Sequence, residues 1–448
     1  MDTVMGTEVL NDSALITQHS LRSRRRATLF LVGVGLPLLA LAAGTLREAI
    51  VVTLGESSDV AKLRRALALD PSNPDLYHRL GLIYAYGSEP LDVAQGLHEL
   101  RRATELNPRV ALYWLDLGAA CEAAGDAACA DAAFTRALDL SPMTPRVRWV
   151  VANHDLRAGR TDAALRHLRE LLALSPEYAR PSFHLCLHLL NDAQAVFDKL
   201  LPSANPELKL AYVNFLSANG GADAAYPIWL QTVAQQPAVP WTSVEPYLER
   251  LLDQGHTREA LSVWQVVEKS VGLFPAHDDA ENLVFNGGFE QAPLNAGFDW
   301  RYRKAAGIAF DFFDPSARQG RRCLRLDFTV SSNREYEPVY QLVPVSASQE
   351  YLLTASARSE NITSKSGPRL RVIDPGSPRC LDVATEATVG TTPWHTVSVH
   401  FSTGAATQFV RLAVWRPRSR SFPTEITGQF WLDSVCLKPQ PLESALRQ

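Results

Sequence analysis

The hydrophobic positions along the chain follow three patterns in turn. Residues 27–46 form an unbroken run of 20 residues without a charged side chain. Residues 56–272 place Ala and Leu at the spacing of amphipathic helices. Residues 282–438 alternate apolar and polar positions, as strands with one buried face do. The sequence therefore predicts a multidomain protein with an N-terminal transmembrane helix, an all-α solenoid and an all-β sandwich.

A fixed period marks the helical region. Pro108, Pro142 and Pro176 are 34 residues apart, and each closes a segment rich in Ala and Leu. Such a period predicts a stack of helix–turn–helix units, because each unit buries its apolar face only against its neighbours.

One of these units resembles a tetratricopeptide repeat. The residues that carry the resemblance are Trp114, Leu117, Gly118, Ala130, Phe134, Ala137 and Pro142. The small residues let two antiparallel helices approach, and the aromatic residues fill the space between neighbouring units. The preceding unit matches at Tyr77, Leu80, Gly81 and Tyr84. The resemblance implies a protein partner in the repeat groove, but all these residues are packing residues, so no partner-binding residue is carried over.

Three segments of the β region resemble the galactose-binding-like jelly rolls that serve as carbohydrate-binding modules. They are NLVFNGGFE (282–290), which would be the opening strand, GRRCLRLDF (320–328) and GQFWLDSVCL (428–437), the closing strand. The resemblance implies a two-sheet jelly roll and a glycan, bound by aromatic faces and polar groups on the outer face of one sheet.

Candidate site residues follow from this resemblance. The noncore face offers Trp415, Arg411, His400 and Arg325, with Trp300 and Tyr336 at the rim. A solvated face or an inter-domain contact is the alternative for each of them. The resemblance also implies a structural calcium with Glu290 and Asp433 as oxygen ligands, for which ordinary surface or turn-capping carboxylates are the alternative.

The N-terminal segment carries its positive charge on one side. Four arginines (22, 24, 25 and 26) precede the apolar run, so the positive-inside rule places residues 1–26 in the cytoplasm. We expect a single-pass protein of the bacterial inner membrane whose body lies in the periplasm. A cleaved signal peptide, with a site near Ala40-Leu41-Ala42, is the rival interpretation, and a buried helix of a soluble protein is a third. Residues 273–281 would be a linker and 439–448 a tail.

Charge and cysteine spacing exclude several functions. The net charge is −4, and residues 282–448 carry 19 basic and 15 acidic residues, which is too few basic residues to predict nucleic-acid binding. Six cysteines without a C-x-x-C pair argue against a zinc site. Cys121 and Cys129 face each other across one helical hairpin, where we favour a buried thiol pair over a disulfide.

No catalytic motif is present, so we expect no enzyme and no required cofactor. Asp311, Asp314 and Asp327 could in principle supply the two carboxylates of a glycosidase, but nothing marks them. We therefore expect an exported, membrane-anchored scaffold with a protein partner on its repeats and a glycan on its jelly roll, acting in cell-surface polysaccharide assembly or export. A purely structural interaction scaffold without sugar binding is the alternative.

Overall fold

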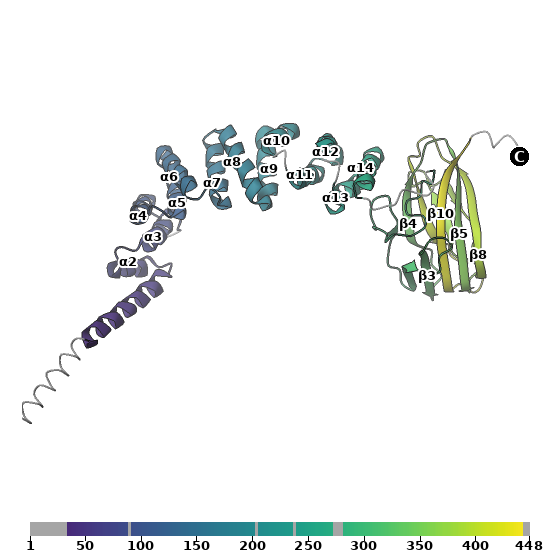
Figure 1. The fold of residues 1–448 in the computed structure, drawn as a ribbon, viewed down its shortest axis with the longest axis horizontal. Helices are drawn as coiled ribbons and strands as arrows, with labels where there is room; N and C mark the ends of the chain where they lie inside the picture. Colours follow the sequence, from purple (N-terminus) through teal and green to yellow (C-terminus); the bar gives the residue numbers. More distant parts are fainter. Residues whose placement is uncertain (1–33, 88–90, 202–204, 236–238, 272–280, 442–448) are drawn as a thin grey trace, which may run out of the picture. The chain divides into compact units, whose positions relative to one another are not determined.

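A computed structural model describes residues 34–87, 91–201, 205–235, 239–271 and 281–441. These residues form two compact units, one ending at Ser175 and one beginning at Pro176, and each is described by itself (Figure 1). The predicted cytoplasmic tail lies outside the described residues. So do residues 27–33 of the predicted anchor, residues 273–280 of the predicted linker and residues 442–448 of the predicted tail.

The first described element is the helix Val34–Gly55. By length and composition it could cross a membrane, and its most apolar window has a mean hydropathy of 1.6. The helix runs past residue 46, where we expected the apolar segment to end. Val51 explains the extension, because it is buried in one cluster with Leu63 and Leu76 of the following helices. The last turns of this helix thus belong to the helical unit.

Seven labelled helices follow in the first unit. Their bounds are α2 Val60–Leu69, α3 Pro74–Tyr86, α4 Val93–Leu106, α5 Ala111–Ala123, α6 Ala127–Leu140, α7 Pro145–Arg157 and α8 Thr161–Leu174. Local chemistry sets where several of them begin. The Asp126 carboxylate accepts a hydrogen bond from the Cys129 N–H at 3.0 Å and so caps α6, while Asn73 and the following Pro74 start α3.

The α5–α6 hairpin packs as the repeat pattern predicts. A Cβ atom at Gly118 would lie 2.7 Å from the Phe134 ring, so only glycine allows this approach. The Trp114 indole N–H donates to the Pro108 carbonyl at 3.0 Å. One repeat earlier, the Tyr77 hydroxyl makes the matching bond to the Pro71 carbonyl. The repetition of this contact confirms the helical-repeat architecture.

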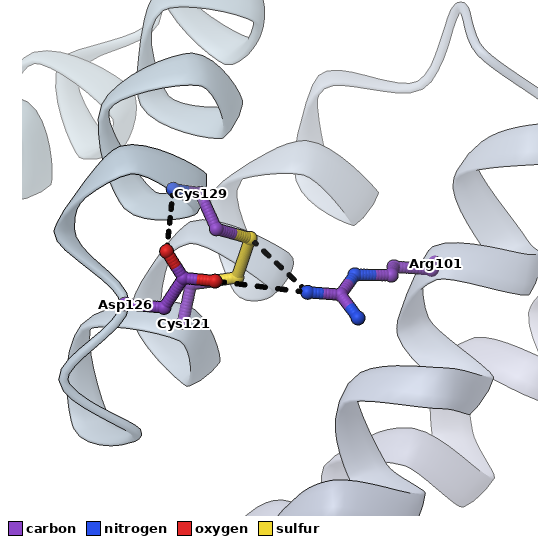
Figure 2. Close-up of a disulfide and its surroundings, with 4 residues drawn as sticks. All are labelled: Arg101, Cys121, Asp126 and Cys129. Atoms are coloured by element: carbon purple, nitrogen blue, oxygen red, sulfur yellow. Dashed lines mark hydrogen bonds and ion pairs between the residues drawn. A yellow bond between two sulfur atoms is a disulfide. The ribbon is translucent and has the colours of Figure 1, made fainter.

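A disulfide joins the two helices of the same hairpin. Figure 2 shows the bond between Cys121 and Cys129, whose Cα atoms are 5.7 Å apart. The Arg101 guanidinium approaches it, lying 3.8 Å from the Cys129 sulfur and 3.9 Å from Asp126. The expected thiol pair was therefore wrong. Sequence spacing could not fix the Cα separation, which in the folded hairpin falls in the range that a disulfide spans.

The second unit begins with six helices. Their bounds are α9 Ala179–Leu190, α10 Ala193–Leu200, α11 Pro206–Asn219, α12 Ala222–Gln235, α13 Trp241–Asp253 and α14 Thr257–Val271. Large aromatic residues fill much of the interior of these helices, beside buried alanines such as Ala222 and Ala225. Trp229, Tyr212 and Tyr247 are fully buried there.

Specific contacts hold the last two helices against the β region within this unit. Glu249 of α13 forms a two-pronged ion pair with Arg301, at 2.8 and 2.9 Å, and accepts the Gly297 N–H at 2.7 Å. The Trp264 ring of α14 meets Phe285 edge to face at 5.0 Å. A Cβ at Gly297 would lie 2.5 Å from the Trp264 ring, and the φ of +58° there also favours glycine. These contacts explain why α9–α14 and the β region form one compact unit.

The β region is a sandwich of two antiparallel five-stranded sheets. The β9 sheet has the order β1-β4-β9-β6-β7, and the β10 sheet has the order β2-β3-β10-β5-β8. The strand bounds are β1 Arg301–Tyr302, β2 Ile308–Asp314, β3 Cys323–Val330, β4 Tyr336–Pro344, β5 Glu350–Ile362, β6 Arg369–Ile373, β7 Asp382–Ala384, β8 Gly390–Ser402, β9 Phe409–Arg416 and β10 Ile426–Gln440. Leu324, Leu326 and Phe328 point into the core from alternate positions of β3. The predicted jelly-roll class of fold is confirmed.

The predicted opening strand is instead a series of turns. Residues 282–290 contain no strand, although Val284 and Phe289 are fully buried. The Asn282 side-chain amide donates to the Val435 carbonyl, and its oxygen accepts the Leu437 N–H, each at 3.0 Å. Two backbone hydrogen bonds of 2.9 Å, from the Leu283 N–H to the Leu437 carbonyl and from the Val435 N–H to the Gly287 carbonyl, also join the segment to β10. The segment thus closes the sandwich against β10 without forming a regular strand.

Candidate functional site

The six predicted glycan-binding residues do not lie together. Trp415 and Arg411 point outward from β9, in the β9 sheet. Arg325 of β3 and the exposed His400 of β8 belong to the β10 sheet, on the opposite side of the sandwich. The prediction that they form a single site was therefore wrong. Alternation along a strand shows which residues face outward, but it does not show which of the two sheets contains the strand.

Trp300 and Tyr336 also differ from their expected places. Trp300 is fully buried, stacks on Phe289 at 5.0 Å between ring centroids and donates its indole N–H to the Asn286 carbonyl. Its predicted position at the rim was therefore wrong, and it is a core residue. Tyr336 is half-buried at the start of β4 and packs against the core. Its hydroxyl oxygen lies 3.2 Å from the hydroxyl oxygen of Ser332.

Arg325 has carboxylate partners of its own. Its guanidinium lies 2.7 Å from Asp314 and 3.2 Å from Asp327. Two of the three carboxylates that could in principle have served a glycosidase are therefore engaged by one arginine.

The predicted calcium pair has a different role in the structure. The buried Asp433 carboxylate accepts the N–H groups of Arg318 and Gln319 at 2.7 and 2.9 Å. Glu290 accepts the Arg321 N–H at 2.7 Å. These donors present positive partial charge where a cation would sit, and the described residues contain no group of three or more His, Cys, Asp or Glu placed to hold a metal. The two carboxylates therefore do not fit a calcium site; they fasten the loop that precedes β3.

The outer face of the β9 sheet is a network of paired charges. Arg371 contacts Glu335, Glu337 and Asp382 at 3.3, 3.0 and 2.7 Å. Hydrogen bonding to Asp382 raises the pKa of Arg371, and the same bond lowers the pKa of Asp382. Arg411 lies 2.8 Å from Glu337. The face is thus charged but internally neutralised.

Trp415 stands at the edge of this network. Its indole N–H donates to Glu335 at 2.6 Å, and the Arg371 guanidinium lies over its ring, 4.5 Å from the centroid. These two contacts fix the indole in one orientation. The remainder of the ring forms part of the wall of a cleft.

This cleft, called here the Trp415 cleft, has a volume of about 740 Å³. It is lined by Asn333, Glu335, Lys365, Ser366, Arg369, Trp415, Pro417, Arg418, Ser419, Arg420 and Ser421. Trp415 belongs to β9 and Arg369 to β6, and the other lining residues come from three loops, which follow β3, β5 and β9. The volume lies within the range of small-molecule binding sites.

One buried arginine joins the three loops. Arg416 is 1% exposed and donates to the carbonyls of Arg334, Ser366 and Thr424, one in each loop, at 2.7, 3.3 and 2.6 Å. Burial lowers the pKa of this guanidinium. Asn333 and Ser419 add a reciprocal pair of bonds between the first and third loops. The shape of the cleft therefore depends on Arg416.

Most of the cleft lies at positions that the sequence did not mark as binding residues. Lys365, Arg369, Arg418 and Arg420 were not singled out, and neither was Phe422, which is 84% exposed in the same loop as the last two. A signal for the loop exists in the sequence. The stretch RPRSRSFP (416–423) places basic residues and turn-forming residues directly after an apolar strand.

A second hollow of about 750 Å³ lies between α14 and the sandwich. Its walls combine the apolar junction residues Leu261, Trp264, Phe285 and Phe298 with polar ones, and they include both a basic and an acidic side chain, Arg258 and Glu268. We therefore take the Trp415 cleft, with its polar and basic lining, as the candidate site.

In the first unit, polar side chains connect the first helices of successive repeats. His78 of α3 lies 2.8 Å from Asp116 of α5, which lies 3.8 Å from Arg146 of α7. The Glu122 carboxylate of α5 accepts two hydrogen bonds from the Arg157 guanidinium, at 2.6 Å from Nη2 and at 3.0 Å from Nε. The polar surface over α3, α5 and α7 is called here the repeat face.

Two exposed side chains accompany the repeat face. Tyr86 is 51% exposed, and partial burial together with Asp116 and Glu122 raises its pKa. Leu112 of α5 is 39% exposed. Both residues lie on the first helices of their repeats, Tyr86 on α3 and Leu112 on α5.

No protein-family model matches the chain, and no curated protein matches its sequence. The crystal structure of MamA protein matches 43% of this chain and 91% of its own, at 15% identity and a TM-score of 0.27. The structure of YrrB, described as a TPR protein with an unusual peptide-binding site, matches 48% of this chain and 94% of its own, at 12% identity and a TM-score of 0.25. A structure titled "CBM4 structure and function" matches 35% of this chain and 99% of its own, at 14% identity and a TM-score of 0.26. Because these TM-scores are low, the class is stated from the chain's own elements: a helical-repeat protein that ends in a jelly-roll sandwich.

Proposed function

We propose that this protein is an exported, membrane-anchored scaffold that binds a protein partner on its repeat face and a glycan in its Trp415 cleft. The observation that carries the glycan assignment is the cleft itself, which combines a fixed indole wall with polar loops. Sugars present flat C–H patches to aromatic rings and hydroxyls to polar groups, so this combination suits them. A role in assembling or exporting a cell-surface polysaccharide would use both surfaces.

Binding rather than catalysis suits the cleft. Hydrolysis of a glycosidic bond needs two carboxylates on either side of the bond. Among the described residues of the lining, Glu335 is the one carboxylate, and it is already bound by Trp415 and Arg371. We therefore propose that the protein is not an enzyme.

Two features support export. The helix Val34–Gly55 has the length and composition of a membrane anchor. The Cys121–Cys129 disulfide is a bond that persists in oxidising compartments such as the periplasm. We propose that the body lies in the periplasm and that the N-terminus lies in the cytoplasm of a bacterial cell.

The glycan assignment is tested with the full chain in a neutral detergent, by affinity electrophoresis against a panel of soluble polysaccharides. We expect at least one to retard the protein, and Trp415→Ala to weaken that binding about tenfold, the loss typical of a central aromatic contact. Trp394→Ala is the matched control, because Trp394 is a half-buried tryptophan of the other sheet. If none of the polysaccharides retarded the protein, the glycan assignment would be overturned in favour of the alternative, a purely structural scaffold without sugar binding.

The partner assignment is tested by placing a photo-crosslinking residue at Tyr86 or Leu112 on the repeat face. The control position is Met143, which is 67% exposed in the turn between α6 and α7. We expect the same discrete adduct from both repeat-face positions in membranes, and none from Met143. Equal labelling at all three positions would contradict a partner in the groove.

A further inference from the structure

The cations of the Trp415 cleft differ in their partners from the arginines on the adjoining face of the β9 sheet. On the outer face of the β9 sheet, Arg371 and Arg411 have carboxylate partners within 3.3 Å. The cations of the Trp415 cleft are Lys365, Arg369, Arg418 and Arg420. Within the described part of the chain, none of these four has a carboxylate at ion-pair distance. Arg371 and Arg411, which do have carboxylate partners, lie on strands of the same sheet. The cleft therefore concentrates positive charge that the protein does not neutralise.

Arg369 shows the consequence at the level of one atom. Its Nε is buried and has no hydrogen-bond partner in the structure. The Trp415 ring lies 5.7 Å from its guanidinium carbon, and burial lowers the pKa of this group. A buried donor on a charged group is costly when it is unpaired, and a guanidinium edge suits the two oxygens of a carboxylate. Arg369 differs from Arg411, whose Nε is also unpartnered, because Arg411 has Glu337 beside its guanidinium and Arg369 has no carboxylate partner among the described residues.

The single carboxylate of the lining does not cancel this charge. Glu335 already accepts the indole N–H of Trp415 at 2.6 Å and lies 3.3 Å from Arg371 on the sheet face. Lys365, Arg418 and Arg420 are exposed around the opening, where they would attract an anionic polymer from solution.

We infer that the Trp415 cleft selects acidic glycans, polymers whose sugar rings carry carboxylates, over neutral ones. This inference rests on the proposed function and names the substrate class of the same site. Arg369 would bind a sugar carboxylate deep in the cleft, and the basic residues of the opening would hold neighbouring carboxylates. The cleft is bounded by three loops and the chain is acidic overall, with a net charge of −4, so an extended nucleic acid fits it less well.

The decisive experiment compares two polymers that differ only in charge. The full chain in neutral detergent is titrated with alginate, a polyuronate, and with the same alginate after reduction of its carboxyl groups. We expect alginate to bind at least about tenfold tighter, and its affinity to fall as the salt concentration rises from about 50 to about 500 mM, because surface charges are then screened. The reduced polymer should show almost no dependence on salt.

Variants locate the charge that matters. Arg369→Gln should weaken alginate binding about tenfold or more and leave binding of the reduced polymer within about twofold. Arg369→Lys keeps the charge without the planar fork, so it should restore part of the affinity. Lys304→Gln is the control, since it makes the same change of charge at an exposed position outside the cleft.

Each outcome decides a separate question. Equal affinity for the two polymers would overturn the acidic selectivity and leave the proposed glycan binding intact. Binding of neither polymer, nor of any in the earlier panel, would overturn both. Comparable binding of an oligothymidylate of about 20 nucleotides, or of vesicles rich in phosphatidylglycerol, would overturn the glycan class, because the cleft would then recognise negative charge on any backbone.

Discussion

The α5–α6 hairpin and the Trp415 cleft differ in how far apart in sequence their parts lie. In the hairpin, Gly118 meets Phe134 within one 34-residue unit, and Trp114 bonds to Pro108, the proline that closes the preceding unit. In the cleft, Arg416 joins loops whose carbonyls belong to residues up to 82 positions away. The hairpin is assembled by local contacts and the cleft by distant ones.

The two regions also use charge differently. In the repeat unit, His78, Asp116 and Arg146 pair across successive helices, so the charges there stabilise the stack. In the cleft, the lining cations remain without carboxylate partners among the described residues. The repeats thus pair their charges with one another, whereas the cations of the cleft are available to another molecule.

The largest expected effect is at the centre of the cleft. Arg416→Ala removes the donors of three backbone carbonyls and leaves a cavity, so we expect the sandwich to lose about 3–5 kcal/mol of unfolding free energy. Urea unfolding followed by tryptophan fluorescence measures this loss. Arg418→Ala, two residues away and exposed, should change stability by less than about 0.5 kcal/mol. Equal losses in the two variants would show that Arg416 does not organise the loops.

The contrast between local and distant contacts explains what the sequence could predict. The repeat was predictable because each of its packing residues lies within one period, where spacing alone places Gly118 against the second helix. Alternation predicted the strands and their buried faces. It could not predict that His400 and Trp415 belong to different sheets, because strand order depends on pairings between distant segments.

The candidate site was less predictable than the fold. Trp415 and Arg411 were found because they alternate with core residues of β9. Arg369 was missed although it also lies on a strand, since what sets it apart is the lack of a partner, which depends on all its spatial neighbours. Glu290 and Asp433 were assigned to calcium by the resemblance alone. Their actual donors, the N–H groups of Arg321 and Arg318, lie in a loop that is distant from both carboxylates in the sequence.

A second prediction concerns Asp299, which combines burial with short-range bonds. Its fully buried carboxylate accepts the N–H groups of Leu294 and Trp300, each at 2.7 Å, yet burial raises its pKa to about 6. Because the pKa in the folded state exceeds that of an unfolded aspartate, the folded state binds the proton more tightly. The contribution of Asp299 to the free energy of unfolding should therefore fall by about 3 kcal/mol as the pH rises from about 4 to about 6, and stay constant above that.

This dependence is isolated by subtraction. Urea unfolding of the protein and of Asp299→Asn at several pH values gives a difference in which other titrating groups cancel. Glu386→Gln, a change at an exposed carboxylate, is the control and should give a difference that does not vary with pH. A constant difference for Asp299→Asn as well would mean that its bonds to the backbone, rather than its burial, dominate.

The smallest expected effect tests the local side of the comparison. Gly118→Ala adds a methyl group 2.7 Å from the Phe134 ring, which must move. Overpacking costs about 1–3 kcal/mol, and the better helix propensity of alanine returns up to about 1 kcal/mol, so we expect a net loss of about 1–2 kcal/mol in the first unit. Thermal unfolding followed by circular dichroism measures it.

A double-mutant cycle decides whether the contact is as local as the repeat pattern implies. Phe134→Leu removes the ring edge that the new methyl group would strike, so the cost of Gly118→Ala should shrink or reverse in that background. The coupling should persist when Trp114 is replaced by Leu, because Trp114 bonds to Pro108 rather than to the Gly118–Phe134 contact. If the Trp114 change abolished the coupling, the hairpin would depend on contacts beyond the pair, and its difference from the cleft would be one of degree.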